Sequence, residues 1–337
     1  MTNATKTLAI IFAGTLALAA AATWSGSGSS SAAFRQQLVG VDTSAVQAVE
    51  VAPPDAPTVR LERTDGAWSV GRPAGDAYPA RASAVERLLT TLPELQVRAV
   101  ATRQPEKHPR YGVDSTGTTV RLLGGDDAPL RAVVIGRTEV RRRDGTQQSQ
   151  SPMQRIQRRG TAITYVRPAD QSDVYSVEAS LGGLVNKDVE AWREKTIWTL
   201  ARSDIQRVHV TTADSAAGTD RTVTIQRAAP RDTASTAEPR WVSAGDTLAT
   251  GAASSLLSTV ASPRADGFAE TRSPDDLSGP AHTVRLRLSD GRERTLRLYP
   301  SGGDTYLATA PDYPYVAEIP KRRWDDSVLR PRSALLK

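Results

Sequence analysis

The succession of strand and helix patterns in this chain occurs twice. Apolar residues alternate around Val49 and Val51, and the same pattern returns around Val208 and Val210. In both copies, a hairpin with a tryptophan, a helix with one apolar stripe and a Thr-Val-Arg-Leu strand follow in the same order. Because each copy can bury one core, the repetition predicts two tandem domains of one fold within the 337 residues.

Each copy combines alternating segments with a single helix. Asp65-Gly66 separates two alternating segments, and both residues tolerate the positive φ of a type I′ hairpin turn. A capping box at Ser83 and Glu86 indicates the start of a helix in the first copy. The apolar stripes of the two helices are Val85, Leu88, Leu89 and Leu92, and then Ala253, Leu256, Leu257 and Val260. The other expected strands are 97–101, 119–123, 130–135, 267–271, 283–288 and 295–299, with closing hairpins within 165–175 and 306–316. The fold class is therefore α+β, with two tandem repeated domains, each a mostly antiparallel sheet with one packed helix.

The first residues contain an export signal. Residues 8–22 are uncharged and mainly apolar and follow Lys6, a length that suits either a cleaved signal peptide or a short membrane anchor. Ala20-Ala21-Ala22 offers a cleavage site, whereas 7–24 can span a bilayer with Trp24 at the interface. The interpretation favours a retained signal anchor in 1–24, with a flexible Gly/Ser tether in 25–37. The bulk of the chain is then expected outside the cytoplasm, attached to a bacterial cell membrane by one pass.

The remaining expected boundaries are a first repeat at 38–200, a second at 201–330 and a C-terminal tail at 331–337. Residues 137–160 form an arginine-rich insertion in the first repeat, with seven arginines against Glu139 and Asp144. The candidate anion- or partner-binding residues are Arg141, Arg142, Arg143, Arg158 and Arg159. A solvated loop without a partner is the alternative that the polar composition favours. Nucleic acid is not an expected partner, since no aromatic residue alternates with these arginines.

Residues for catalysis are scarce in the sequence. The absence of cysteine excludes disulfides, cysteine nucleophiles and thiolate metal sites. His108, His209 and His282 are isolated in sequence, and no phosphate loop or nucleophile elbow is present. Asp126-Asp127 and Asp325-Asp326 are more typical of a turn and of surface pairing than of acid/base chemistry. Trp68 and Trp241 are expected in the cores. We therefore predict no catalytic residue, no cofactor and no metal site.

Several local motifs resemble one bacterial family, known only as domain of unknown function 4340. They are Tyr111-Gly112-Val113-Asp114, Thr118-Thr119-Val120-Arg121-Leu122, the hairpin of Trp68, the helix 84–92, Val134-Ile135-Gly136, and Tyr165-Val166 with Val174-Tyr175. The resemblance implies an N-terminal membrane segment, an extracytoplasmic remainder and an accessory role beside ABC transporter components of the gliding-motility type. It implies no catalytic residue.

The expected function is that of a membrane-tethered extracytoplasmic protein, a non-enzymatic accessory or scaffold of a transport system. A first alternative is a module that binds an anionic polymer or lipid headgroups through the arginine-rich insertion. A second alternative is a hydrolase with a site assembled from scattered carboxylates.

Overall fold

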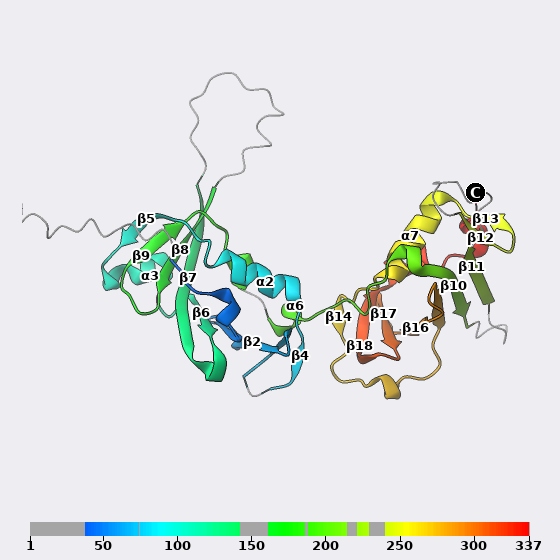
Figure 1. Cartoon of the computed structure of the whole chain (residues 1–337), viewed down its shortest axis with the longest axis horizontal. Coiled ribbons are helices and arrows are strands. Elements are labelled where there is room, and N and C mark those ends of the chain that lie inside the picture. The colour runs from blue at the N-terminus through cyan, green and yellow to red at the C-terminus, as the bar shows by residue number, and fades with distance from the viewer. Residues whose placement is uncertain are drawn as a thin grey trace, which may run out of the picture. The chain divides into compact units, whose positions relative to one another are not determined.

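The chain forms two separate folded units. The structure is a computed structural model and describes residues 38–73, 75–141, 161–185, 188–213, 221–228 and 240–336. The chain divides between Arg193 and Glu194, and each unit contains one nine-stranded sheet (Figure 1). Two tandem α+β domains are thereby confirmed.

The first unit is an antiparallel sheet with short helices. Its strands are β1 (Ala48–Ala52), β2 (Val59–Thr64), β3 (Ala67–Gly71), β4 (Ala77–Pro79), β5 (Val97–Thr102), β6 (Thr118–Leu123), β7 (Pro129–Arg141), β8 (Thr161–Pro168) and β9 (Val174–Val177). They lie in the order β4-β3-β2-β1-β6-β7-β8-β9-β5. The α-helices are α2 (Ala82–Thr91), α3 (His108–Tyr111), α5 (Gly182–Val185) and α6 (Val189–Trp192).

The second unit repeats this arrangement strand for strand. Its strands are β10 (Ile205–Thr212), β11 (Arg221–Arg227), β12 (Trp241–Ser243), β13 (Asp246–Thr247), β14 (Gly267–Phe268), β15 (His282–Leu288), β16 (Glu293–Pro300), β17 (Thr305–Ala310) and β18 (Tyr313–Pro320). Their order is β13-β12-β11-β10-β15-β16-β17-β18-β14, with helices α7 (Thr250–Ala261) and α8 (Lys321–Ser327). The spatial order of the two sheets is therefore the same.

The pairing registers show that the repetition extends to single residues. Val51 lies opposite Val59 and Val120, and Val210 lies opposite Val223 and Val284. Followed outward from these pairs, the registers place Trp68 opposite Arg63 and Trp241 opposite Arg227. The two tryptophans thus occupy equivalent positions, as predicted. Trp241 is buried, and Trp68 packs against the edge of the first core.

Each main core lies between one face of a sheet and its longest helix. In the first unit, Val85, Leu88 and Leu92 are buried in one cluster with Val49 and Leu61. In the second, Leu256 and Val260 are buried with Val208, Leu286 and Leu296. Alternate residues of a strand point to opposite faces, so the residues between these valines and leucines lie on the other, open face of each sheet. Both predicted apolar stripes are confirmed.

Local details differ from the expectations where long-range contacts decide them. The N-cap of α2 is Arg81 without a side-chain cap, so the predicted capping box at Ser83 is wrong. The backbone N–H of Arg81 donates to the Trp192 carbonyl at 2.8 Å, which sets the start of the helix before Ser83. Asp65 and Gly66 have φ of 52° and 81°, as the predicted type I′ turn requires.

Strand and unit boundaries also shift. β14 ends at Phe268 rather than at 271, because the chain turns there and Arg272 N–H donates to the Ala269 carbonyl. β7 continues through 136–141, where it pairs with β8, so the start of the arginine-rich insertion is strand. Residues from Glu194 onward belong to the second unit, since Ile197, Trp198 and Leu200 pack on its core. The expected C-terminal tail is packed as well, because Leu335 is buried in the same core.

A small second core covers part of the open face of each sheet. Val113 packs there with Val134, Tyr165 and Val174 in the first unit, and Tyr299 packs with Leu307 and Val316 in the second. Gly136 of β7 lies directly beneath the backbone of 111–113. A Cβ at Gly136 would overlap the Tyr111 carbonyl oxygen and lie 2.6 Å from Val113 Cγ1. Two of the family-like motifs therefore touch, and the contact requires glycine.

This close approach gives a stability prediction. Gly136→Ala should lower the free energy of unfolding by about 1–3 kcal/mol, because the loop 111–113 must move away from β7. Gly183→Ala is the matched control in the same unit, since a Cβ there meets nothing within 4 Å. Denaturant unfolding of the full chain measures both. Equal effects of the two substitutions would show that the contact with Tyr111 does not constrain residue 136.

Candidate functional site

The described residues next to the predicted arginines form a two-stranded ribbon. Arg141 ends β7, with its backbone opposite Thr161 of β8. The side chain of Arg141, and Arg142, Arg143, Arg158 and Arg159 altogether, lie outside the described residues. The ribbon formed by 138–141 and 161–164 is therefore what the structure shows of this candidate site (Figure 1). Val140 on the ribbon is 66% exposed.

A hollow of about 480 Å³ lies at the base of the ribbon. Its walls are the turn after β1 (53–56), the loop after α3, and Gly136 and Arg137 of β7. The hydroxyl of Thr116 donates to Asp114 at 2.6 Å, and this bond, together with the charge of Arg137, lowers the pKa of Asp114. Arg137 and the lining threonines give the hollow the chemistry to hold a small anionic or hydroxyl-bearing group.

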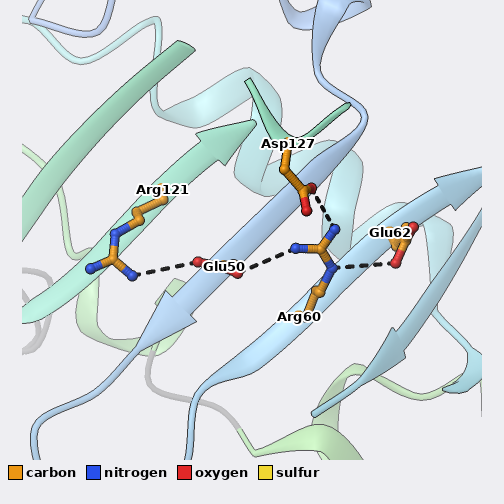
Figure 2. Close-up of polar contacts among 5 residues, drawn as sticks. All are labelled: Glu50, Arg60, Glu62, Arg121 and Asp127. Atoms are coloured by element: carbon orange, nitrogen blue, oxygen red, sulfur yellow. Dashed lines mark hydrogen bonds and ion pairs between the residues drawn. The ribbon is translucent and has the colours of Figure 1, made fainter. Parts of the chain in front are cut away.

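The open face of the first sheet carries a network of charges (Figure 2). The Arg60 guanidinium binds Asp127 at 2.6 Å, Glu50 at 3.2 Å and Glu62 at 3.3 Å. Glu50 also binds Arg121 on β6 at 3.4 Å. Hydrogen bonding to Asp127 raises the pKa of Arg60. The network ties the turn that contains Asp127 to three neighbouring strands, so these carboxylates hold structure in place.

Asp126 and Asp127 form the predicted turn, with φ of 53° and 58°. The second aspartate pair divides between two roles. Asp326 pairs with Arg322 at 3.6 Å, the predicted surface pairing, whereas Asp325 accepts a hydrogen bond from the Tyr306 hydroxyl at 2.7 Å. Asp126 and Asp127 thus lie in a turn, and Asp325 and Asp326 each contact one neighbouring side chain.

Two histidines of the second unit bind neighbouring threonines. His282 Nδ1 lies 3.1 Å from Thr212 Oγ1, and the His282 ring meets the Tyr306 ring edge-on at 5.4 Å between centroids. Burial lowers the pKa of His282, and burial together with Asp325 raises the pKa of Tyr306. His209 Nδ1 lies 2.9 Å from Thr224 Oγ1. In the part of the chain that the structure describes, no group of three His, Asp or Glu side chains converges as a metal site would.

The charge network and the His282 cluster were not predicted from the sequence. Glu50, Arg60 and Arg121 do carry a signal, because each charged residue stands between two apolar residues of a strand. Bringing them together requires the register of three strands, which the local pattern does not contain.

The fold and these sites define a protein of two repeated antiparallel α+β units. The chain belongs to the family described as Domain of unknown function (DUF4340), whose model matches residues 71–146 and 157–285. The match extends from β3 to β15 and thus includes parts of both units. No curated protein and no solved structure matches the chain. Within the described ranges, no helix has the length and apolarity needed to cross a membrane.

The environment of His282 predicts a pH-dependent stability. A histidine whose pKa is lowered in the folded state takes up its proton more readily in the unfolded state. The free energy of unfolding should therefore fall as pH decreases from about 7 to about 5, and His282→Gln should reduce that slope. Urea unfolding midpoints across this range test it, with His108→Gln, at a half-buried histidine of the first unit, as the control. An unchanged slope in His282→Gln would contradict the effect of burial.

Proposed function

We propose that this protein is a membrane-tethered extracytoplasmic accessory or scaffold protein of a transport system, without catalytic activity of its own. The proposal combines the family resemblance, the leader sequence and the structural contacts that polar side chains make on the two sheets. In this proposal, the folded units bind and position other components of the transport system.

The observation that carries the non-enzymatic part is the engagement of candidate acid/base groups in structural contacts. Glu50, Glu62 and Asp127 all bind Arg60, and Asp325 binds Tyr306. His282 is held by Thr212 and by ring packing, and its lowered pKa keeps it neutral at pH 7. Acid/base catalysis requires such groups to reach a substrate, and these side chains are held by their neighbours instead.

Tethering is supported by the order of segments along the chain. Leu38, the first described residue, is buried with 2% exposure. The Gly/Ser-rich sequence 25–31 and the apolar run 8–22 precede it. An apolar run, a linker and then a folded unit is the order expected of a signal-anchored protein.

Cell fractionation tests the tether. The full chain should sediment with membranes and resist extraction by high salt, whereas a chain starting at Ala33 should remain soluble, because the apolar run is then absent. Mature protein starting at Thr23 in the soluble fraction would show that the leader is a cleaved signal peptide. Copurification of the full chain with transporter subunits from the same membranes tests the accessory role.

A second candidate is the binding of an anionic polymer or lipid headgroups through Arg141, Arg142, Arg143, Arg158 and Arg159. It is favoured by the place of Arg137 in the hollow at the base of the ribbon and by the exposure of Val140. Clustered basic residues attract anionic surfaces.

A further inference from the structure

The open faces of the two sheets carry different charges at equivalent positions. We name the second one the arginine face and define it by Arg207, Arg285, Arg287 and Arg297. All four side chains are exposed, and the matching registers align them with Ala48, Arg121, Leu123 and Val134 of the first unit. Three of the four arginines thus stand where the first unit has apolar residues.

Among the described residues, none of these four arginines has a carboxylate within ion-pair distance. Arg121, the one equivalent arginine, binds Glu50 at 3.4 Å. In the second unit, His209 takes the place of Glu50 and Thr224 takes the place of Arg60. These two residues bind each other, and Arg207 donates to the amide oxygen of Gln226 at 3.2 Å. The second unit therefore lacks the ion pairs that Glu50 forms with Arg60 and Arg121 in the first. Glu293 lies directly opposite Arg287 on β16, but among the described residues the two side chains form no ion pair.

The arginine face also contains a like-charge pair. Arg207 lies directly opposite Arg287 on adjacent strands, and Glu293 is the neighbour of Arg287 on the other side. Like charges in opposed cross-strand positions destabilise a sheet. An anion bound between the two guanidinium groups would reverse that repulsion, since guanidinium forms paired hydrogen bonds with carboxylates.

The geometry of the face favours an extended acidic polypeptide. Arg285 and Arg287 are two residues apart on β15, a spacing of about 6.8 Å along a strand. Acidic side chains at alternate positions of an extended peptide repeat at the same distance, so that several of them meet arginines at once. The two cross-strand neighbours of Arg285 are His209 and Thr295, and no exposed aromatic residue stands there to stack nucleic-acid bases.

We infer that the arginine face is a docking surface for an acidic extended segment of a partner protein. Arg285 and Arg287 bind alternate carboxylates, Arg207 shares the second of them, and Arg297 extends the site toward the small second core. Arg297 also lines a hollow of about 640 Å³ beside that core, which offers space for a flanking side chain. The surface is formed by described strands alone and requires neither the membrane tether nor the arginine-rich insertion.

The test measures binding of a fluorescein-labelled peptide of alternating Glu and Thr to the purified full chain by fluorescence anisotropy. The affinity should fall as salt rises, because exposed charges are screened. Changing Arg207, Arg285, Arg287 and Arg297 together to Gln should weaken binding about tenfold or more. The thermal stability of this variant should stay close to that of the parent, because the change removes both the repulsion between Arg207 and Arg287 and the attraction between Arg287 and Glu293.

Two matched control variants show which surface binds the peptide. Arg121→Gln changes the equivalent position of the first unit and should leave the affinity unchanged. The joint change of Arg141, Arg142, Arg143, Arg158 and Arg159 to Gln should do the same, which separates this surface from the insertion. The inference is overturned if the peptide does not bind, if the fourfold variant binds as well as the parent, or if either control loses as much affinity. Stronger binding to phosphatidylserine vesicles or to an anionic wall polymer than to the peptide would overturn the assignment to a protein partner.

Discussion

The pairing of β1 with both β2 and β6 is the interaction on which the first unit depends, and β10 has the same role in the second. The strands β1 to β4 follow one another as antiparallel neighbours, and so do β6 to β9. Only the β1–β6 pairing joins the two groups into one sheet. It also fixes which residues face the helix, since Val49 and Val51 then point to the core and Glu50 to the open face. Both the buried cores and the exposed charges follow from this register.

Much of this fold could be predicted from the sequence because its elements are local. Hairpins such as the one at Asp65-Gly66 and the helix stripe of Val85 and Leu88 are specified by neighbouring residues. The start of α2 could not be predicted from Ser83 and Glu86, because a backbone hydrogen bond to Trp192 decides it. The boundary at Arg193 also depends on contacts with residues distant in sequence, whereas β14 ends at a local turn.

The candidate sites also differ in whether neighbouring residues or long-range strand pairing specify them. Charge density alone identified the arginine-rich insertion, although most of it lies outside the described residues. The Arg60 network and the arginine face depend on which residues lie opposite one another in neighbouring strands. The sequence does not show that Glu50, Arg60 and Arg121 lie close together. It also does not show that Arg207 lies opposite Arg287, because both facts depend on the strand register.

Duplication gives the chain two copies of a scaffold whose open faces have diverged. In the first unit, acidic and basic side chains neutralise one another around Arg60. In the second, arginines remain exposed while the core residues beneath them, such as Val208 and Leu286, keep the same packing. Since side chains on the open face contribute little to the core, this face can change without loss of the fold.

The central claim is that each unit is a complete fold held together by its own central strand pairing. Denaturant unfolding of residues 194–337 expressed alone tests it most directly, with the full chain as the reference. The account predicts one cooperative transition with the same midpoint as the second unit has within the full chain. A chain that fails to fold alone, or a midpoint strongly lowered by removal of the first unit, would contradict it.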